Sequence, residues 1–141
     1  MQRDLWSNIN CDRVLSPGVA VTDNTAQVGQ IIDTKGYESL TFVLLSGSLA
    51  DTDATFTLLV EDGDNSSLTD SASVADEFLL GTEAASTFLF SDDNEVRWIG
   101  YNGNKRYVRL TVTPADNSGD VYLAIVAIKG NPNSAPTTMD S

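Results

Sequence analysis

The sequence predicts an all-β protein, an antiparallel β-sandwich or jelly roll of about eight strands with extended N- and C-terminal arms. Two observations predict this class. Apolar and polar residues alternate with period two in several short segments, as expected of strands with one buried face. Turn-forming residues separate these segments, and no segment shows a convincing amphipathic helix. The 141 residues suit a single domain with a substantial hydrophobic core.

Several segments have strand character. In chain order they are Val19–Thr22, Gln30–Asp33, Leu40–Ser46, Thr55–Glu61, Glu77–Leu80, Thr87–Phe90, Glu95–Tyr101, Tyr107–Thr113 and Tyr122–Lys129. The alternation is clearest where Phe56, Leu58 and Val60 interleave with polar residues. Pro114 ends the strand that precedes it, because proline has no amide to donate to a neighbouring strand.

The connections are predicted from turn chemistry. Asn102–Gly103 stands between two strand patterns and predicts a β-hairpin, because Asn-Gly readily supplies the two positive φ angles of a type I′ turn. Ser66–Asp76 contains only Leu68 and Val74 as larger apolar residues. It is therefore predicted to be a long loop with at most one helical turn.

The chain divides into three predicted parts: an N-terminal arm at residues 1–12, a β-sandwich domain at 13–130 and a flexible C-terminal tail at 131–141. The arm contains one exposed anchor, Trp6. The tail is polar and carries two prolines, so it is not expected to join a central strand. The start of the chain has no apolar signal segment, and the apolar runs are too short to span a bilayer, so we expect synthesis in the cytoplasm.

Composition argues against several classes of function. The chain has 20 acidic and 8 basic residues, a net charge of −12, and no Lys or Arg between Lys35 and Arg97. Such a surface repels nucleic acid and anionic membranes, so neither is an expected partner. The chain has no histidine, the commonest general base near neutral pH, and its single cysteine, Cys11, has no partner for redox work. We therefore expect no enzymatic activity and no cofactor.

Two acidic segments have a chemical and a structural interpretation. Asp92–Glu95 could supply the paired carboxylates of a hydrolase, but the segment resembles a turn, where Asp and Asn are common. Glu61–Asn65, together with Asp51 and Asp53, could supply oxygen ligands to calcium. The segment lacks the ligand spacing and the helices of an EF-hand, so a solvated connection is the favoured interpretation and a bound calcium ion stays an open alternative.

Two strands are apolar on both faces, Leu40–Leu45 and Val121–Ile128. Their second face must be covered by a loop, by a terminal arm of the same chain or by a neighbouring subunit, and the sequence leaves these alternatives open. Basic and aromatic residues also gather around Asn102, in a pattern that favours a protein contact over a nucleic-acid platform and leaves plain sheet surface as an open alternative. The predicted partner-binding residues are Trp6, Arg97, Trp98, Tyr101, Lys105, Arg106, Tyr122 and Val126.

The order of several motifs resembles a known family. The motifs are Ile32–Val43, an acidic middle, Lys105–Thr113, the apolar strand Val121–Ile128 and the closing segment Lys129–Pro136. This order resembles the small β-sandwich proteins found beside the major capsid protein of tailed bacteriophages, the head decoration or cement proteins. The resemblance covers most of residues 9–136 and rests on strand motifs, without a catalytic signature.

The resemblance implies a structural virion protein on the outer surface of the capsid, synthesised in the host cytoplasm. Its implied partners are the major capsid protein and further copies of itself, as a dimer or trimer. It would stabilise the head by bridging neighbouring capsid subunits. The alternative is a carbohydrate- or receptor-binding module of a phage tail or fibre, because jelly rolls also serve lectins, and Trp98 with Tyr101 could stack on sugars.

Overall fold

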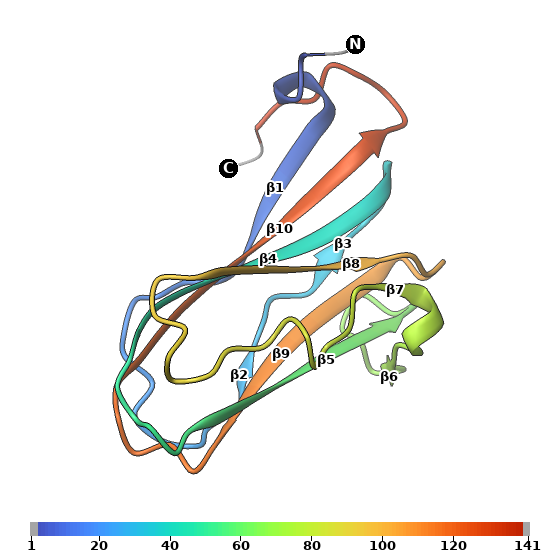
Figure 1. Cartoon of the computed structure of the whole chain (residues 1–141). Helices are drawn as coiled ribbons and strands as arrows, with labels where there is room; N and C mark the ends of the chain where they lie inside the picture. The colour runs from blue at the N-terminus through green and yellow to red at the C-terminus, as the bar shows by residue number, and fades with distance from the viewer. Residues whose placement is uncertain (1–2, 140–141) are drawn as a thin grey trace.

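The computed structural model describes residues 3–139, which form a β-sandwich of two antiparallel sheets (Figure 1). Sheet A has the strand order β1-β10-β4-β8-β7, and sheet B has the order β2-β9-β5-β6, with β3 also paired to β9. The predicted all-β class is confirmed. The strands are β1 (Ile9–Leu15), β2 (Gln27–Val28), β3 (Ile32–Asp33), β4 (Tyr37–Leu49), β5 (Thr55–Gly63), β6 (Ala72–Ser73), β7 (Leu79–Leu80), β8 (Val96–Tyr101), β9 (Tyr107–Ala115) and β10 (Val121–Pro132).

Helical structure within residues 3–139 is confined to two single turns of 3₁₀-helix, η1 (Trp6–Asn8) and η2 (Asp76–Phe78). No helix in this part of the chain is long and apolar enough to cross a membrane. The turn η2 and the two-residue strand β7 occupy the segment Glu77–Leu80, where a longer strand was predicted.

The core lies between the two sheets and is built from the alternating positions of the long strands. From sheet A, Phe42 and Leu44 of β4 point inward and are fully buried. From sheet B, Val108 and Leu110 of β9 meet them and are equally buried. Burying a side chain of this size contributes about 1.5–3 kcal/mol to folding, so this layer holds the sheets together.

Two predicted strands are absent from the sheets. Val19–Thr22 contributes only an isolated bridge between Val21 and Val121. Thr87–Phe90 runs as a loop, although Phe88 in its middle is buried. The backbone turns after this residue because Asp92 Oδ2 accepts a hydrogen bond from the Leu89 amide at 2.7 Å. An alternating segment can therefore bury its central residue without pairing.

The predicted hairpin at Asn102–Gly103 is wrong. The strands that flank it belong to different sheets, because β8 pairs with β4 and β7, whereas β9 pairs with β5. Neither residue has a positive φ angle. Gly103 is required for a different reason: the loop passes so close to the ring of Tyr101 that a Cβ atom at Gly103 would overlap the phenol. The segment is a sheet-to-sheet connection wrapped around one side chain.

Sheet A extends into both terminal regions. Residues 9–12 of the predicted N-terminal arm lie in β1 and pair with β10, and residues 131–132 of the predicted tail lie at the end of β10. The following segment returns to the start of β1, where the Thr137 amide donates to the Ser7 carbonyl at 2.9 Å. Both chain ends consequently lie at the same end of the sandwich (Figure 1). Residues 1–2 and 140–141 are outside the described part of the chain.

This end of sheet A buries a polar cluster. Lys129 on β10 is 6% exposed, and its Nζ lies 2.8 Å from Asp12 Oδ2 on β1 and 4.9 Å from the centre of the Tyr37 ring. The side-chain Nδ2 of Asn10 donates to the hydroxyl of Tyr37 at 3.2 Å. Buried polar groups are tolerated when they are paired in this way, which explains how residues of a polar N-terminal segment form a strand.

Candidate docking surfaces

The outward side of sheet A carries a continuous apolar surface. We call this surface the outer patch and define it as Val43, Leu45, Leu80, Val96, Trp98, Tyr122, Ala124, Val126 and Ile128. The strand register builds it in rows. Val126 of β10 pairs with Val43 of β4, which pairs with Trp98 of β8. Because paired residues point to the same side of a sheet, side chains far apart in the sequence become neighbours on one face.

The outer patch is uncovered. Trp98 is 67% exposed, Leu45 is 49% exposed and Val126 is 40% exposed. The outward positions of β4, β8 and β10 that form the patch carry no charged residue, although the chain as a whole has 28. On the neighbouring edge strand β1, Arg13 pairs with Val126 and is exposed at the margin of the patch. Within residues 3–139, neither terminal segment covers it. Monomeric proteins rarely leave a contiguous apolar surface of this kind to water, and such surfaces mark contacts with other proteins or ligands.

Three of the predicted partner-binding residues meet in the outer patch: Trp98, Tyr122 and Val126. Sequence reasoning missed Val96, which shares the outward face of β8 with Trp98, although the period-two pattern of that strand contains the signal. It also missed Leu80, which lies beside Gly100 of β8 only because β7 pairs there. No local sequence pattern predicts the pairing of β7 with β8.

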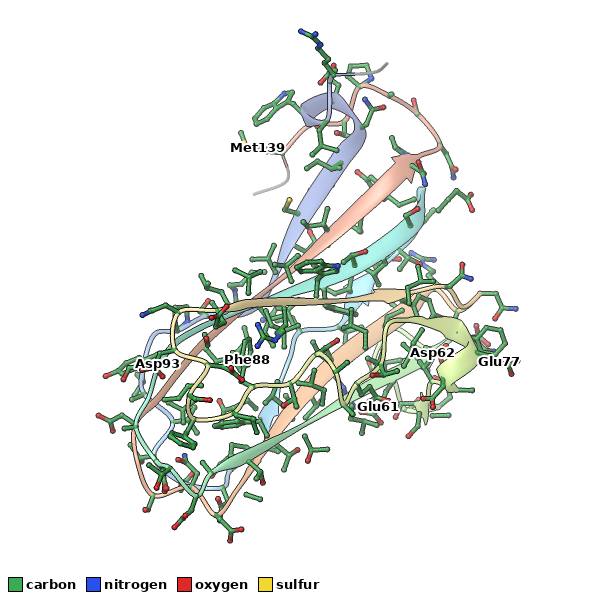
Figure 2. The ribbon with its side chains drawn as sticks, in the orientation of Figure 1. Glu61, Asp62, Glu77, Phe88, Asp93 and Met139 are labelled. Atoms are coloured by element: carbon green, nitrogen blue, oxygen red, sulfur yellow. The ribbon has the colours of Figure 1, made fainter. Side chains whose placement is uncertain are left out.

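Trp6 lies elsewhere, at the end of the sandwich where the termini meet. It lines a shallow hollow together with Ile9, Cys11 and Met139, and we call these four residues the terminal cluster. Trp6 is 67% exposed and Met139 is also exposed. In Figure 2, Met139 lies beside the N-terminal turn, at the far end of sheet A from the loops that carry Asp93. The terminal cluster adjoins the outer patch, because its Cys11 on β1 pairs with Ile128 on β10, and it continues the exposed apolar surface to the end of the sandwich.

The predicted basic residues are already paired with carboxylates. Lys105 Nζ lies 2.8 Å from Asp64 Oδ2. Arg106 binds both carboxylate oxygens of Asp33 at 2.8 Å. These pairs sit on the connection between the sheets and not on the outer patch. Each cation is neutralised within the chain, so the two residues do not form a free basic surface for nucleic acid.

Arg97 points away from the outer patch. Its guanidinium lies 3.5 Å from Asp92 Oδ1 and 5.4 Å from the centre of the Phe88 ring. The aromatic contact and the ion pair fix the loop that follows β7 against β8. Arg97 therefore serves the fold in this structure, in contrast to its neighbour Trp98, which faces solvent.

Tyr101 is buried, at 7% exposure, and so offers no contact surface to a partner. Its hydroxyl donates to Asp62 Oδ2 at 2.6 Å and accepts from the Lys105 amide at 3.0 Å. Burial, and then the hydrogen bond to Asp62, raise the pKa of Tyr101 well above its ordinary value. The residue predicted to bind a partner instead ties sheet A to sheet B.

We expect Tyr101→Phe to lower the free energy of unfolding by about 1–2 kcal/mol, because the substitution leaves the Lys105 amide and Asp62 without their shared partner. Urea denaturation measures the loss. Tyr122→Phe is the matched control, since its hydroxyl lies on the exposed outer patch. An equal loss in the two variants would contradict the structural role given to Tyr101.

Carboxylates of the acidic segments accept hydrogen bonds or form ion pairs within the chain. Asp93 Oδ1 accepts from the Leu49 amide at 3.0 Å, and Asp51 Oδ2 accepts from the Ser118 amide at 2.7 Å. Glu61 pairs with Arg109 at 3.1 Å. Figure 2 shows Glu61 and Asp62 well separated from Asp93. In the part of the chain that the structure describes, no group of three or more Asp, Glu or Cys side chains could hold a metal ion.

Acid should destabilise the fold. The Arg106 guanidinium lowers the pKa of Asp33, and backbone amides lower the pKa values of Asp51 and Asp70. A carboxyl with a lowered folded-state pKa stabilises the fold above its unfolded pKa, about 4, and loses that contribution as the pH falls. Burial raises the pKa of Glu83, which acts in the opposite sense. We expect the urea midpoint to fall between pH 6 and pH 3, and less so in Asp51→Asn; a constant midpoint would contradict this.

Comparison with known proteins leaves the family open. No family model matches the chain, and no curated protein matches it in sequence. Among solved structures, the SPBc2 prophage-derived protein YomS is similar, with a TM-score of 0.52 and 16% identity over 88% of this chain and 94% of that chain. The CBM22-1–GH10 modules of xylanase 10B from Clostridium thermocellum, complexed with xylohexaose, give a TM-score of 0.47 and 12% identity over 94% of this chain and 28% of that one. The similarity to YomS shows a shared β-sandwich fold, whereas the xylanase likeness is too low to carry an argument.

Proposed function

We propose that this chain is a structural virion protein that binds the outer surface of a bacteriophage capsid and bridges neighbouring capsid subunits. The observation that carries the proposal is the pair of exposed apolar surfaces, the outer patch and the terminal cluster, on a chain that is otherwise strongly acidic. A bridge needs at least two contacts. The motif order resembling decoration proteins and the fold shared with a prophage-derived protein support the same function.

The proposed mechanism is mechanical. The terminal cluster contacts the major capsid protein, with Trp6 as its large aromatic anchor, because interface cores favour such residues. Each contact is weak but repeats over a symmetric shell, and linked contacts gain avidity. Rupture of the shell must then break these bridges as well, so binding favours the intact shell by mass action. The net charge of −12 keeps the particle exterior from adhering to nucleic acid.

Capsids purified without this chain test the proposal. Added protein should co-sediment with the shells at a saturating, fixed ratio and raise the temperature at which they rupture. Bovine serum albumin, which is also acidic, is the control for non-specific adhesion. Protein that stays in the supernatant at micromolar concentration, or binding with no change in rupture temperature, would count against the proposal.

A carbohydrate- or receptor-binding module of a tail or fibre is the second candidate. One observation favours it: Trp98 stands exposed on a sheet face, where an indole ring can stack on a sugar. Tyr101 was expected to share this platform, but it is buried. A glycan array distinguishes the two functions. Specific binding that Trp98→Ala abolishes would favour the module, and a blank array would leave the capsid proposal in place.

A further inference from the structure

The outer patch has the properties of a self-complementary interface. A partner chosen by charge would need ionic groups to pair with, and the outward positions of β4, β8 and β10 in the patch have none. A second copy carries the same net charge of −12, so it can approach only where carboxylates are absent. The outer patch is such a place. Two identical apolar faces bury each other without burying a carboxylate, and Arg13 of the edge strand β1, which pairs with Val126 on this face, stays exposed at the margin.

The shape of the outer patch favours a two-fold arrangement. The large side chain of Trp98 protrudes from β8, whereas the small Ala124 leaves a depression on β10. A two-fold axis parallel to β4 lays β8 of each copy over β10 of the other. Trp98 of one copy then lies over Val126 and Ala124 of its partner, and Val43 meets Val43 near the axis. Sheets packed face to face in this way lie about 10 Å apart with nearly aligned strands.

The size of the patch suits a reversible dimer. With strands about 4.8 Å apart and a rise of about 3.4 Å per residue, the area from β10 to β7 and from Tyr122 to Ile128 is roughly 450 Å² per copy. Two such faces together amount to at most roughly 900 Å². This value is below that of stable specific interfaces and suits a weak, reversible contact.

We propose that two copies of this chain pair through the outer patch, sheet A against sheet A, with Trp98 of each copy seated over Val126 and Ala124 of the other. The inference rests on the proposed function and deepens it. With the outer patches joined, Cys11 of each copy lies over Leu80 of the other, at the margin of the interface. Trp6 and Met139 of the two copies lie beyond this margin at one end of the dimer, and they supply the two capsid contacts that a bridge requires.

Sedimentation equilibrium of the purified chain tests the dimer without any capsid. The mass should rise from one chain towards two as the concentration increases from roughly 1 to 100 μM. Added salt should strengthen the dimer, because it screens the repulsion between two acidic chains. A single-chain mass throughout, a three-chain mass, or dissociation by salt would overturn the proposal.

Val126→Asp should weaken the dimer at least tenfold, because it buries a carboxylate opposite Trp98. Val28→Asp is the matched control: it adds the same charge at an exposed valine in β2 of sheet B, and its mass should follow the wild type. If Val126→Asp does not fold, Trp98→Gln replaces it, since that side chain is largely exposed. A disrupting variant that dimerises like the wild type would overturn the interface.

Tryptophan fluorescence tests whether Trp98 lies in the dimer interface. Trp6→Phe leaves Trp98 as the sole tryptophan, and its emission should shift to the blue as the concentration rises. A constant emission maximum while the mass doubles would overturn the role of Trp98. The tests are independent of the capsid function: a dimer that shells do not bind contradicts only the proposed function, and a monomer that coats shells contradicts only the dimer.

Discussion

Trp6→Ala is expected to weaken binding to capsids by roughly 30-fold per contact, while folding and dimer formation stay unchanged. The side chain is 67% exposed in the free protein, so its removal leaves no cavity in the core. In the proposed complex, the indole is the aromatic anchor of the terminal cluster, and truncating such an anchor typically costs about 2 kcal/mol or more. A dimer bound through both of its terminal clusters loses this energy twice, so the effect on avidity is larger still.

Co-sedimentation with capsids measures this loss, and thermal unfolding of the free protein verifies that the fold persists. Trp6→Phe is the conservative control, because a phenyl ring retains most of the apolar contact, and its binding should stay within about threefold of the wild type. Trp98→Ala separates the two surfaces, since it should lower dimerisation and leave the single contact intact. Wild-type binding by Trp6→Ala would refute the assignment of the terminal cluster to the capsid.

Lys129→Met is expected to produce the largest loss of stability, about 2–4 kcal/mol. The ammonium lies 2.8 Å from Asp12 Oδ2 and 3.4 Å from the carbonyl oxygen of Asp33, inside the polar cluster of sheet A. Removing one partner of a buried ion pair typically costs about 3–5 kcal/mol, because the other charge is left uncompensated. The expected loss is smaller here because the Asp12 side chain retains 29% exposure.

Lys105→Met is the matched control for this prediction. Lys105 and Asp64 are also 2.8 Å apart, but their side chains are 43% and 68% exposed, so the loss of stability should be much smaller than in Lys129→Met. Urea denaturation of the two variants compares identical substitutions at identical pair distances. Equal losses would show that burial does not set the value of these ion pairs. The double variant Asp12→Leu with Lys129→Met should regain part of the stability.

Local patterns predicted the strands with clear alternation. β5, β9 and β10 contain the predicted segments, because the same side chains that alternate in the sequence, such as Leu58 and Leu110, fill the core. The prediction that Pro114 ends its strand is wrong, because β9 continues to Ala115 and Pro114 pairs with Phe56. The patterns failed where a distant residue decides the conformation. The hydroxyl of Tyr101 binds Asp62, 39 residues away, and the connection after β8 wraps around that ring instead of forming a hairpin.

The candidate surfaces were also predicted only in part, where local sequence patterns were sufficient. The sequence identified Trp98, Tyr122 and Val126 because they lie on strands with too many apolar residues for one buried face. It also grouped Arg106 with them, since proximity in the sequence was the only guide. The partner of Arg106 is Asp33, 73 residues away, and that ion pair already neutralises the charge of the guanidinium within the chain. Register and long-range pairing, which join the patch into one face, arise only in the folded chain.

The most direct measurement of the central claim is the copy number of this chain in purified phage particles, quantified against the major capsid protein. A protein that bridges capsid subunits through repeated contacts should be present in hundreds of copies, in a fixed ratio to the shell protein. A few copies per particle, or none in particles that contain a complete head, would contradict the account.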